Sequence, residues 1–265
     1  MHPVLFTVRD VAIRSHDVFV ALGVLAALVV FAREVRRRGE WDERLLVVIA
    51  LTLFGGAIGM RASGLVRHLD PSANPSIADG LRYGAKSVLG GLTGAYVGAL
   101  IGKRIAGYTK RTGDLFAPAV AIGMAIGRVG CLLAEAPGRP TTLPWGVHVD
   151  PANAALVGEC PGCAIGAAMH PSFAYEIAFH LLAFVALQRM RGRTLPAGET
   201  LTLYLAAYGA FRFAVEFTRA NETVWLGLTR PQWFLVPTLA LLLWHLRRNA
   251  RAGTYAALRP GLEPA

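Results

Sequence analysis

Long apolar stretches alternate with short polar ones along the whole chain, and each apolar stretch is close to the ~20 residues that cross a bilayer core as a helix. No alternating apolar and polar pattern of ~10 residues recurs, so a transmembrane barrel is not expected. The pattern predicts an all-α polytopic membrane protein with seven transmembrane helices, forming one integral membrane domain over residues 1–265. The seven stretches lie at roughly 16–33, 45–64, 86–102, 115–134, 172–189, 200–218 and 231–246.

The composition agrees with a membrane protein. Hydrophobic residues make up 54% of the chain and charged residues 17%, below the ~25% of a typical soluble domain. This excludes a disordered, collagen-like or disulfide-rich miniprotein and argues against a soluble enzyme. The first ten residues lack the basic start of a cleavable signal peptide, so the first apolar stretch is expected to remain as a helix. The net charge of +10 lies in short clusters between apolar stretches, so it indicates topology, and no nucleic acid partner is expected.

Arginine and lysine residues gather after every odd-numbered stretch, on the side that the positive-inside rule assigns to the cytoplasm. The N-terminus is therefore predicted outside, the C-terminus in the cytoplasm, and a long loop at about 135–171 on the extracytoplasmic side. The loop after the second stretch is less clear, because it holds Arg67, Arg82 and Lys86. The basic residues after the odd-numbered stretches are Arg33, Arg36, Arg37, Arg38, Arg44, Lys103, Arg104, Lys110, Arg111, Arg189, Arg191, Arg193, Arg247, Arg248 and Arg251.

Glycines recur every four residues in the third stretch, at Gly90, Gly94, Gly98 and Gly102. Small residues at this spacing let two membrane helices approach closely, so tight packing alone explains them. The additional Gly91 has two interpretations, close packing or room for a ligand.

Ionisable side chains inside apolar stretches are costly unless they are paired or hydrated, so each is a candidate for function. In the predicted topology they all fall in the outer half of the membrane. Two explanations compete: buried ion pairs that hold helices together, for instance Arg212 with Glu216, or a site whose excess of arginine binds an anion. Phosphate is the obvious anion, because guanidinium groups match its oxygens in pairs. The residues in question are Arg61, Arg128, Tyr175, Glu176, Tyr208, Arg212 and Glu216.

The long loop adds polar residues of its own, among them Glu135, Arg139 and His170. His170 comes directly before Pro171, at the predicted start of a helix. It is therefore either a site residue or an ordinary residue of the membrane interface.

The three cysteines differ in their settings. Cys131 ends the fourth apolar stretch and is expected to be a packing residue. Cys160 and Cys163 lie in the outer loop, where a local disulfide is the first expectation and a redox motif or half of a metal site are the alternatives. No second pair of cysteines or histidines has the spacing of a metal site, so neither a metal nor a cofactor is expected.

Four groups of motifs, in this order, resemble those of the bacterial prolipoprotein diacylglyceryl transferases. The resemblance covers nearly the whole chain, and the seven-span, N-outside topology of that family is the topology expected here. The motifs are 90–94 (GGLTG), 127–131 (GRVGC) with 138–140 (GRP) and 143–146 (LPWG), 170–176 (HPSFAYE), and 208–219 (YGAFRFAVEFTR).

The resemblance implies a reaction in the bacterial plasma membrane. A diacylglyceryl group moves from phosphatidylglycerol to the thiol of the lipobox cysteine in the signal peptide of a prolipoprotein, and glycerol phosphate is released. Arg128 and Arg212 are expected to hold the phosphate, because they gain more as charge builds on the leaving oxygen. Glu216 is expected to orient Arg212, and Tyr208 to donate to a phosphate or glyceryl oxygen.

The apolar stretches are expected to contact membrane lipids, and further residues are expected to bind the substrates, either from the resemblance or, as for Arg61, from a charge in an apolar stretch. Glu135 and Arg139 are expected to shape the mouth where the peptide arrives. The full set of substrate-binding candidates is Arg61, Gly90, Gly91, Glu135, Gly138, Arg139, His170, Tyr175 and Glu176.

The chain departs from the family pattern where a base is often proposed. Well-known members have histidine just before the paired glycines, and here that position is Leu89; Cys131 replaces an asparagine. Either that histidine is dispensable, or another group such as His16 is the base, or the acceptor has changed. The alternatives to the expected function are thus the same fold acting on another acceptor, or a non-catalytic phospholipid-binding membrane protein.

Overall fold

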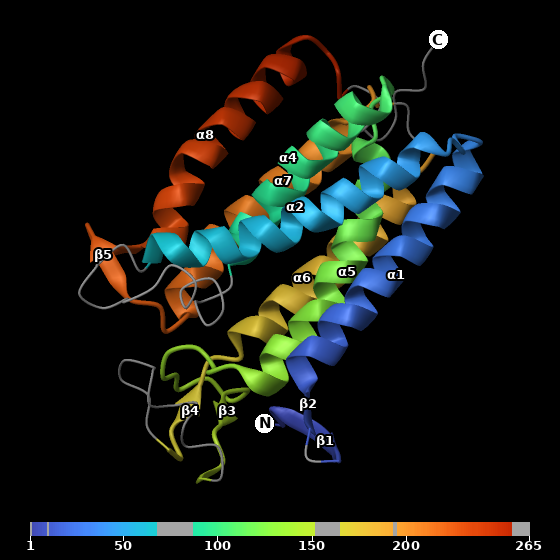
Figure 1. Ribbon diagram of the computed structural model, residues 1–265. Helices are drawn as coiled ribbons and strands as arrows, with labels where there is room; N and C mark the ends of the chain where they lie inside the picture. The colour runs from blue at the N-terminus through green and yellow to red at the C-terminus, as the bar shows by residue number, and fades with distance from the viewer. Residues whose placement is uncertain (1, 10, 68–86, 152–164, 193–194, 256–265) are drawn as a thin grey trace. The chain divides into compact units, whose positions relative to one another are not determined.

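The computed structural model describes residues 2–9, 11–67, 87–151, 165–192 and 195–255 (Figure 1). These residues divide into two compact units. The larger unit comprises Met1–Val35 and Arg111–Ala265, and the smaller unit comprises Arg36–Lys110. Cys160 and Cys163, with their expected disulfide, lie outside the described residues, and the single-domain organisation stays a prediction.

The described part of the chain is mostly helical, as predicted. Each of the seven predicted stretches corresponds to a helix, and most helix ends lie within a few residues of the predicted ends. Within the described residues, three helices are long and apolar enough to cross a membrane, namely Ser15–Arg38, Arg44–Ala62 and Gly113–Ala134. The count of seven spans and their orientation stay predictions. The helices are α1 Ser15–Arg38, α2 Arg44–Arg67, α4 Val88–Ala106, α5 Gly113–Ala134, α6 Ser172–Arg189, α7 Glu199–Val215 and α8 Arg230–Arg251.

The smaller unit is a pair of helices, α2 and α4, in contact through their glycines. A Cβ atom on Gly94 would lie 2.2 Å from the carbonyl oxygen of Gly55, and one on Gly98 would lie 2.1 Å from that of Leu51. Side chains there would force the helices apart, so the glycine spacing serves close packing. At Gly91 the nearest atom would be Met60 Cβ at 3.5 Å, an ordinary contact.

The larger unit packs α1, α5, α6, α7 and α8, with α1, α5 and α6 running side by side in Figure 1. Glycine again sets the closest approach, because a Cβ on Gly23 of α1 would lie 2.6 Å from the carbonyl oxygen of Gly123 on α5. Buried residues of α5, α6 and α7 form an apolar core that holds these three helices together. The core residues are Ala117, Ala121, Leu187 and Tyr204.

Among the described residues, three short antiparallel strand pairs, here called hairpins, lie outside the helices. The sequence did not predict them, because strands of two to five residues carry too little alternation to be recognised. They precede α1, connect α5 to α6, and connect α7 to α8, so they lie at one end of the larger unit. The strands are β1 Val4–Val8, β2 Val11–Arg14, β3 Val147–His148, β4 Ala168–Met169, β5 Thr223–Trp225 and β6 Leu228–Thr229.

Candidate functional site

The carboxylate of Glu176 is the centre of a buried polar cluster at this end of the larger unit. Its side chain is fully buried near the start of α6. One oxygen lies 2.5 Å from Arg128 Nη2 and 3.1 Å from the hydroxyl of Tyr208, which donates to it. The other oxygen lies 3.1 Å from Arg219 Nη1. Glu176 therefore joins the end of α5 to the middle of α7 and to the short turn that follows α7.

Glu216 forms the second half of the cluster. Its carboxylate pairs with Arg212 one helical turn earlier, as expected from their spacing. It also accepts hydrogen bonds from Asn221 Nδ2 at 2.6 Å and Thr229 Oγ1 at 2.8 Å, and Arg219 Nε lies 3.9 Å from it. Arg219 thus bridges the two carboxylates.

The cluster holds more positive than negative charge. Among the described residues, the cluster has three arginines, Arg128, Arg212 and Arg219, and two glutamates, which leaves a net charge of +1. Burying an uncompensated charge is costly. In addition, Arg128 Nε is buried and has no hydrogen-bond partner among the described residues. Both features favour an anionic ligand with several acceptor oxygens.

Phe173 fixes the arginines from the side. The Arg219 guanidinium lies 4.3 Å from the centre of the Phe173 ring, and that of Arg128 lies 5.7 Å from it. An aromatic face attracts a guanidinium without using its N–H groups. The contacts with Phe173 therefore occupy none of the N–H donors of these two arginines.

The loop after α5 packs directly on this cluster. The Gly138 N–H donates to the carbonyl of His170 at 2.8 Å, and Arg139 Nε donates to the carbonyl of Arg219 at 3.0 Å. A Cβ on Gly138 would lie 2.1 Å from the carbonyl oxygen of Thr218. Only glycine permits this approach, so the packing of the loop explains a glycine at position 138 without any contact to a substrate.

Tyr175 connects the loop to the first turn of α6. Its hydroxyl lies 2.9 Å from Trp145 Nε1, which donates to it, and 3.2 Å from His170 Nδ1. These contacts give His170 and Tyr175 a place at the edge of the cluster.

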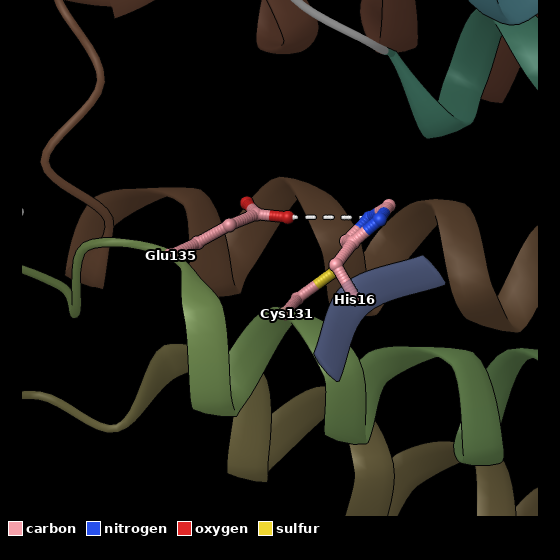
Figure 2. Close-up of side chains that lie close together, drawn as sticks. All are labelled: His16, Cys131 and Glu135. Carbon is pink, nitrogen blue, oxygen red and sulfur yellow. Dashed lines mark ion pairs between the residues drawn. The ribbon is translucent and has the colours of Figure 1, made fainter. Parts of the chain in front are cut away.

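Figure 2 shows a second group of polar side chains, His16 at the start of α1 with Cys131 and Glu135 at the end of α5. His16 Nε2 lies 3.7 Å from a Glu135 oxygen, and His16 Nδ1 lies 3.4 Å from the carboxylate of Asp17. Cys131 is a buried free thiol, as expected for a packing residue, and its sulfur lies 3.9 Å from Arg128 Nη1. The two groups are therefore neighbours.

The predicted site residues fall into two sets. Those of the larger unit gather in the two groups described above or in the loop that packs on them. Arg61, Gly90 and Gly91 lie on α2 and α4 of the smaller unit. The catalytic and binding roles assigned to all of these residues stay predictions.

Several residues of the cluster were not predicted from the sequence as site residues. Arg219 stood at the end of the last recognised motif, which is the signal that points to it. Asn221 and Thr229 carry no such signal, because their contact with Glu216 depends on the fold of the hairpin. His180 is fully buried on α6, where its Nδ1 lies 2.9 Å from the Tyr204 hydroxyl.

The fold and this cluster define a class, a helical protein with helices long and apolar enough to cross a membrane and with a buried, arginine-rich cluster. Comparison with known proteins gives the family. The model of the prolipoprotein diacylglyceryl transferase family matches residues 3–247. The chain therefore belongs to this family of transferases, which confirms the predicted resemblance and its expected function in lipoprotein biosynthesis.

Individual members of the family align with this chain over most of their lengths. The chain is 32% identical to the phosphatidylglycerol–prolipoprotein diacylglyceryl transferase of Nitratidesulfovibrio vulgaris (strain DP4), over 96% of this chain and 97% of the relative. It is 31% identical to the enzyme of the same name from Leifsonia xyli subsp. xyli (strain CTCB07), over 95% of this chain and 77% of the relative. The enzyme of that name from Fervidobacterium nodosum is also 31% identical, over 82% and 75% respectively.

Proposed function

We propose that this chain transfers a diacylglyceryl group from phosphatidylglycerol to the lipobox cysteine thiol of a prolipoprotein and releases glycerol phosphate. It acts as a multi-pass protein of the bacterial plasma membrane, with seven spans and its N-terminus outside. Support for the substrates comes from the names of its relatives, which are phosphatidylglycerol–prolipoprotein diacylglyceryl transferases. Support for the topology comes from the match between apolar stretches and helices, and from the basic residues that follow the odd-numbered helices.

The single observation that carries the proposal is the surplus of buried arginine around two glutamates. Arg128, Arg212 and Arg219 supply more charge than Glu176 and Glu216 neutralise. The phosphate of phosphatidylglycerol is an anion that would supply the missing negative charge. It also presents several acceptor oxygens to the arginine donors.

The same arrangement suits the chemical step. When the acceptor sulfur attacks the glyceryl carbon, the carbon–oxygen bond breaks and negative charge builds on the departing phosphate oxygen. Arginines held in place beforehand stabilise that charge more in the transition state than in the ground state. In this proposal Arg128 and Arg212 hold the phosphate and Glu216 orients Arg212. Tyr208 donates to Glu176 and accepts from Arg128, and its expected donation to a phosphate or glyceryl oxygen stays a prediction.

The test combines purified full-length protein, phosphatidylglycerol vesicles and a lipobox peptide, with the products measured by mass spectrometry. We expect a peptide heavier by one diacylglyceryl group, together with glycerol phosphate. Arg128→Ala should lower the rate by ~10²–10³, the cost of losing one donor to a developing oxyanion. Arg128→Lys should restore part of the rate, because an ammonium keeps the charge and loses the paired donors.

Arg191→Lys is the matched control. Arg191 pairs with Glu34 near the C-terminal ends of α6 and α1, whereas the cluster contacts α6 near its start. The control should leave the rate unchanged. If no peptide product forms while bound phosphatidylglycerol is retained, the chain is a lipid-binding protein and the proposed catalysis is wrong. If glycerol phosphate appears without peptide product, the acceptor is a different thiol or another nucleophile, an alternative raised by Leu89.

A further inference from the structure

The group of His16, Cys131 and Glu135 offers three different metal-binding atoms to one point. The imidazole nitrogen, the sulfur and a carboxylate oxygen all lie within 4.8 Å of one another. In Figure 2 the Glu135 carboxylate and the Cys131 sulfur both turn toward the His16 ring. Nitrogen, sulfur and oxygen donors in one set suit Zn²⁺, which binds all three kinds.

The backbone holds these residues in place. Cys131 and Glu135 are four residues apart, so they project from one face at the end of α5. A Cβ on the neighbouring Gly130 would lie 2.9 Å from the Cα of His16, so the two helices are as close here as glycine allows. The histidine is thus fixed opposite the cysteine and the glutamate.

A second carboxylate supports the histidine from behind. Asp17 lies 3.4 Å from Nδ1 of His16, while Nε2 faces Glu135. Histidines that bind metals usually donate their other ring N–H to a carboxylate, which sets the tautomer and orients the ring. An ion pair between His16 and Glu135 alone would not require the second carboxylate, Asp17, at the other ring nitrogen.

Only small movements would close the site around an ion. Tetrahedral zinc with bonds of about 2.0–2.3 Å places its ligand atoms about 3.5 Å apart. The distance between His16 Nε2 and Glu135 Oε1 is already 3.7 Å. The Glu135 side chain is 43% exposed and can rotate, whereas Cys131 is buried and fixed.

Three protein ligands leave one position of a tetrahedral ion open, as in catalytic zinc sites. We propose that His16, Cys131 and Glu135 bind a divalent ion of the zinc class, and that its open position takes the acceptor cysteine of the peptide as a thiolate. This inference rests on the proposed function. It assigns the activation of the acceptor thiol to three named residues, and it gives Cys131 a role beyond packing.

The position fits the chemistry of the transfer. A thiol bound to zinc loses its proton to solvent, and the thiolate is the nucleophile. Its sulfur forms a bond to the glyceryl carbon of phosphatidylglycerol as the carbon–oxygen bond breaks. The departing glycerol phosphate takes the electron pair and remains at the arginines. The sulfur of Cys131 lies 3.9 Å from Arg128 Nη1, so the ion and the phosphate would be adjacent.

The first test uses cobalt as a spectroscopic probe for the site. Cys160→Ser and Cys163→Ser together remove the other two cysteines of the chain, so any thiolate-to-cobalt charge-transfer band must come from Cys131. We expect one equivalent of Co²⁺ to give this band and Zn²⁺ to displace it. Asp17→Asn should weaken binding ~10–100-fold, the usual cost of losing a supporting partner of a ligand.

Cys131→Ser, added to this background, should abolish the band. Zn²⁺ should raise the unfolding temperature of the background protein and leave that of Cys131→Ser unchanged, which separates loss of the site from loss of the fold. No band in folded background protein overturns the inference. So does a rise in the unfolding temperature with Zn²⁺ that survives Cys131→Ser, His16→Gln and Glu135→Gln alike.

The second test asks what the open position binds. A lipobox peptide should roughly double the charge-transfer intensity, because a second thiolate joins the ion. The same peptide with serine in place of its cysteine should have no effect. Equal responses to both peptides overturn the proposed role of the ion.

The transferase assay then separates this inference from the proposed function. A chelator should lower the transfer rate of the wild type at least 10-fold. Zn²⁺ should restore the rate of the wild type but not that of Cys131→Ser, His16→Gln or Glu135→Gln. Full activity after chelation, with no bound metal, overturns the inference and leaves the proposed function standing. The reverse result is also informative. If the cobalt band responds to the peptide but the protein has no transferase activity with or without metal, the metal site is correct and the proposed reaction is wrong.

Discussion

Replacing Glu176 with glutamine tests whether the buried arginines are free to bind an anion. Glu176 accepts from Arg128, Arg219 and Tyr208, so it is the carboxylate with which a phosphate would compete for Arg128 and Arg219. Glu176→Gln keeps the shape of the side chain and removes its charge. The net charge of the cluster rises from +1 to +2. We expect the fold to lose stability and anion binding to become stronger.

The magnitudes follow from the contacts. Removing one partner of a buried ion pair costs ~3–5 kcal/mol, and the remaining amide oxygen keeps Glu176→Gln near ~3 kcal/mol. Each hydrogen bond to a charged group that passes from the carboxylate to a bound phosphate contributes ~1.5–3 kcal/mol. One such bond corresponds to at least ~10-fold tighter binding, because ~1.4 kcal/mol is a factor of ten.

The assay is chemical unfolding in detergent, followed by tryptophan fluorescence, with glycerol phosphate affinity measured by calorimetry. Glu34→Gln is the matched control, because Glu34 is equally buried and pairs with Arg191 at 3.0 Å. It should lose stability without any gain in affinity. If Glu176→Gln binds glycerol phosphate no better than the wild type, Arg128 and Arg219 serve the fold alone and the anion site is wrong.

Two further predictions concern packing and pH. Gly94→Ala should destabilise the smaller unit by ~1–3 kcal/mol, because its Cβ would lie 2.2 Å from a backbone oxygen, whereas Gly91→Ala should unfold like the wild type. Chemical unfolding measures both, and a loss of transferase activity in Gly91→Ala alone would favour ligand space over packing at that position. At the other end of the larger unit, burial and the hydrogen bond to Glu199 raise the pKa of Tyr255 to about 12. A raised pKa stabilises the fold below the ordinary value of about 10 and ceases to do so as the pH rises through 12. The wild type should therefore lose stability between pH 10 and 12 relative to Tyr255→Phe in a pH series of unfolding curves, and parallel curves would contradict this role.

Much of the helical framework was predictable because it depends on local sequence. In a membrane, an apolar stretch of ~20 residues forms a helix whichever other helices it packs against, because its backbone must satisfy its own hydrogen bonds there. The spacing of Arg212 and Glu216 also fixed their pairing, because residues four apart share a helix face. The hairpins were not predictable, because their strands are too short to show a period.

The sequence by itself determined where the helices lie, which family the motifs resemble, and that costly arginines are present in apolar surroundings. Only the tertiary structure decided which carboxylate each arginine meets. Arg128 and Tyr208 are 80 residues apart, yet they share the carboxylate of Glu176. Likewise, His16 faces Cys131 and Glu135 because glycine lets α1 and α5 approach at that point. The physical reason is that such contacts depend on how helices pack, and packing joins residues that local periodicity cannot relate.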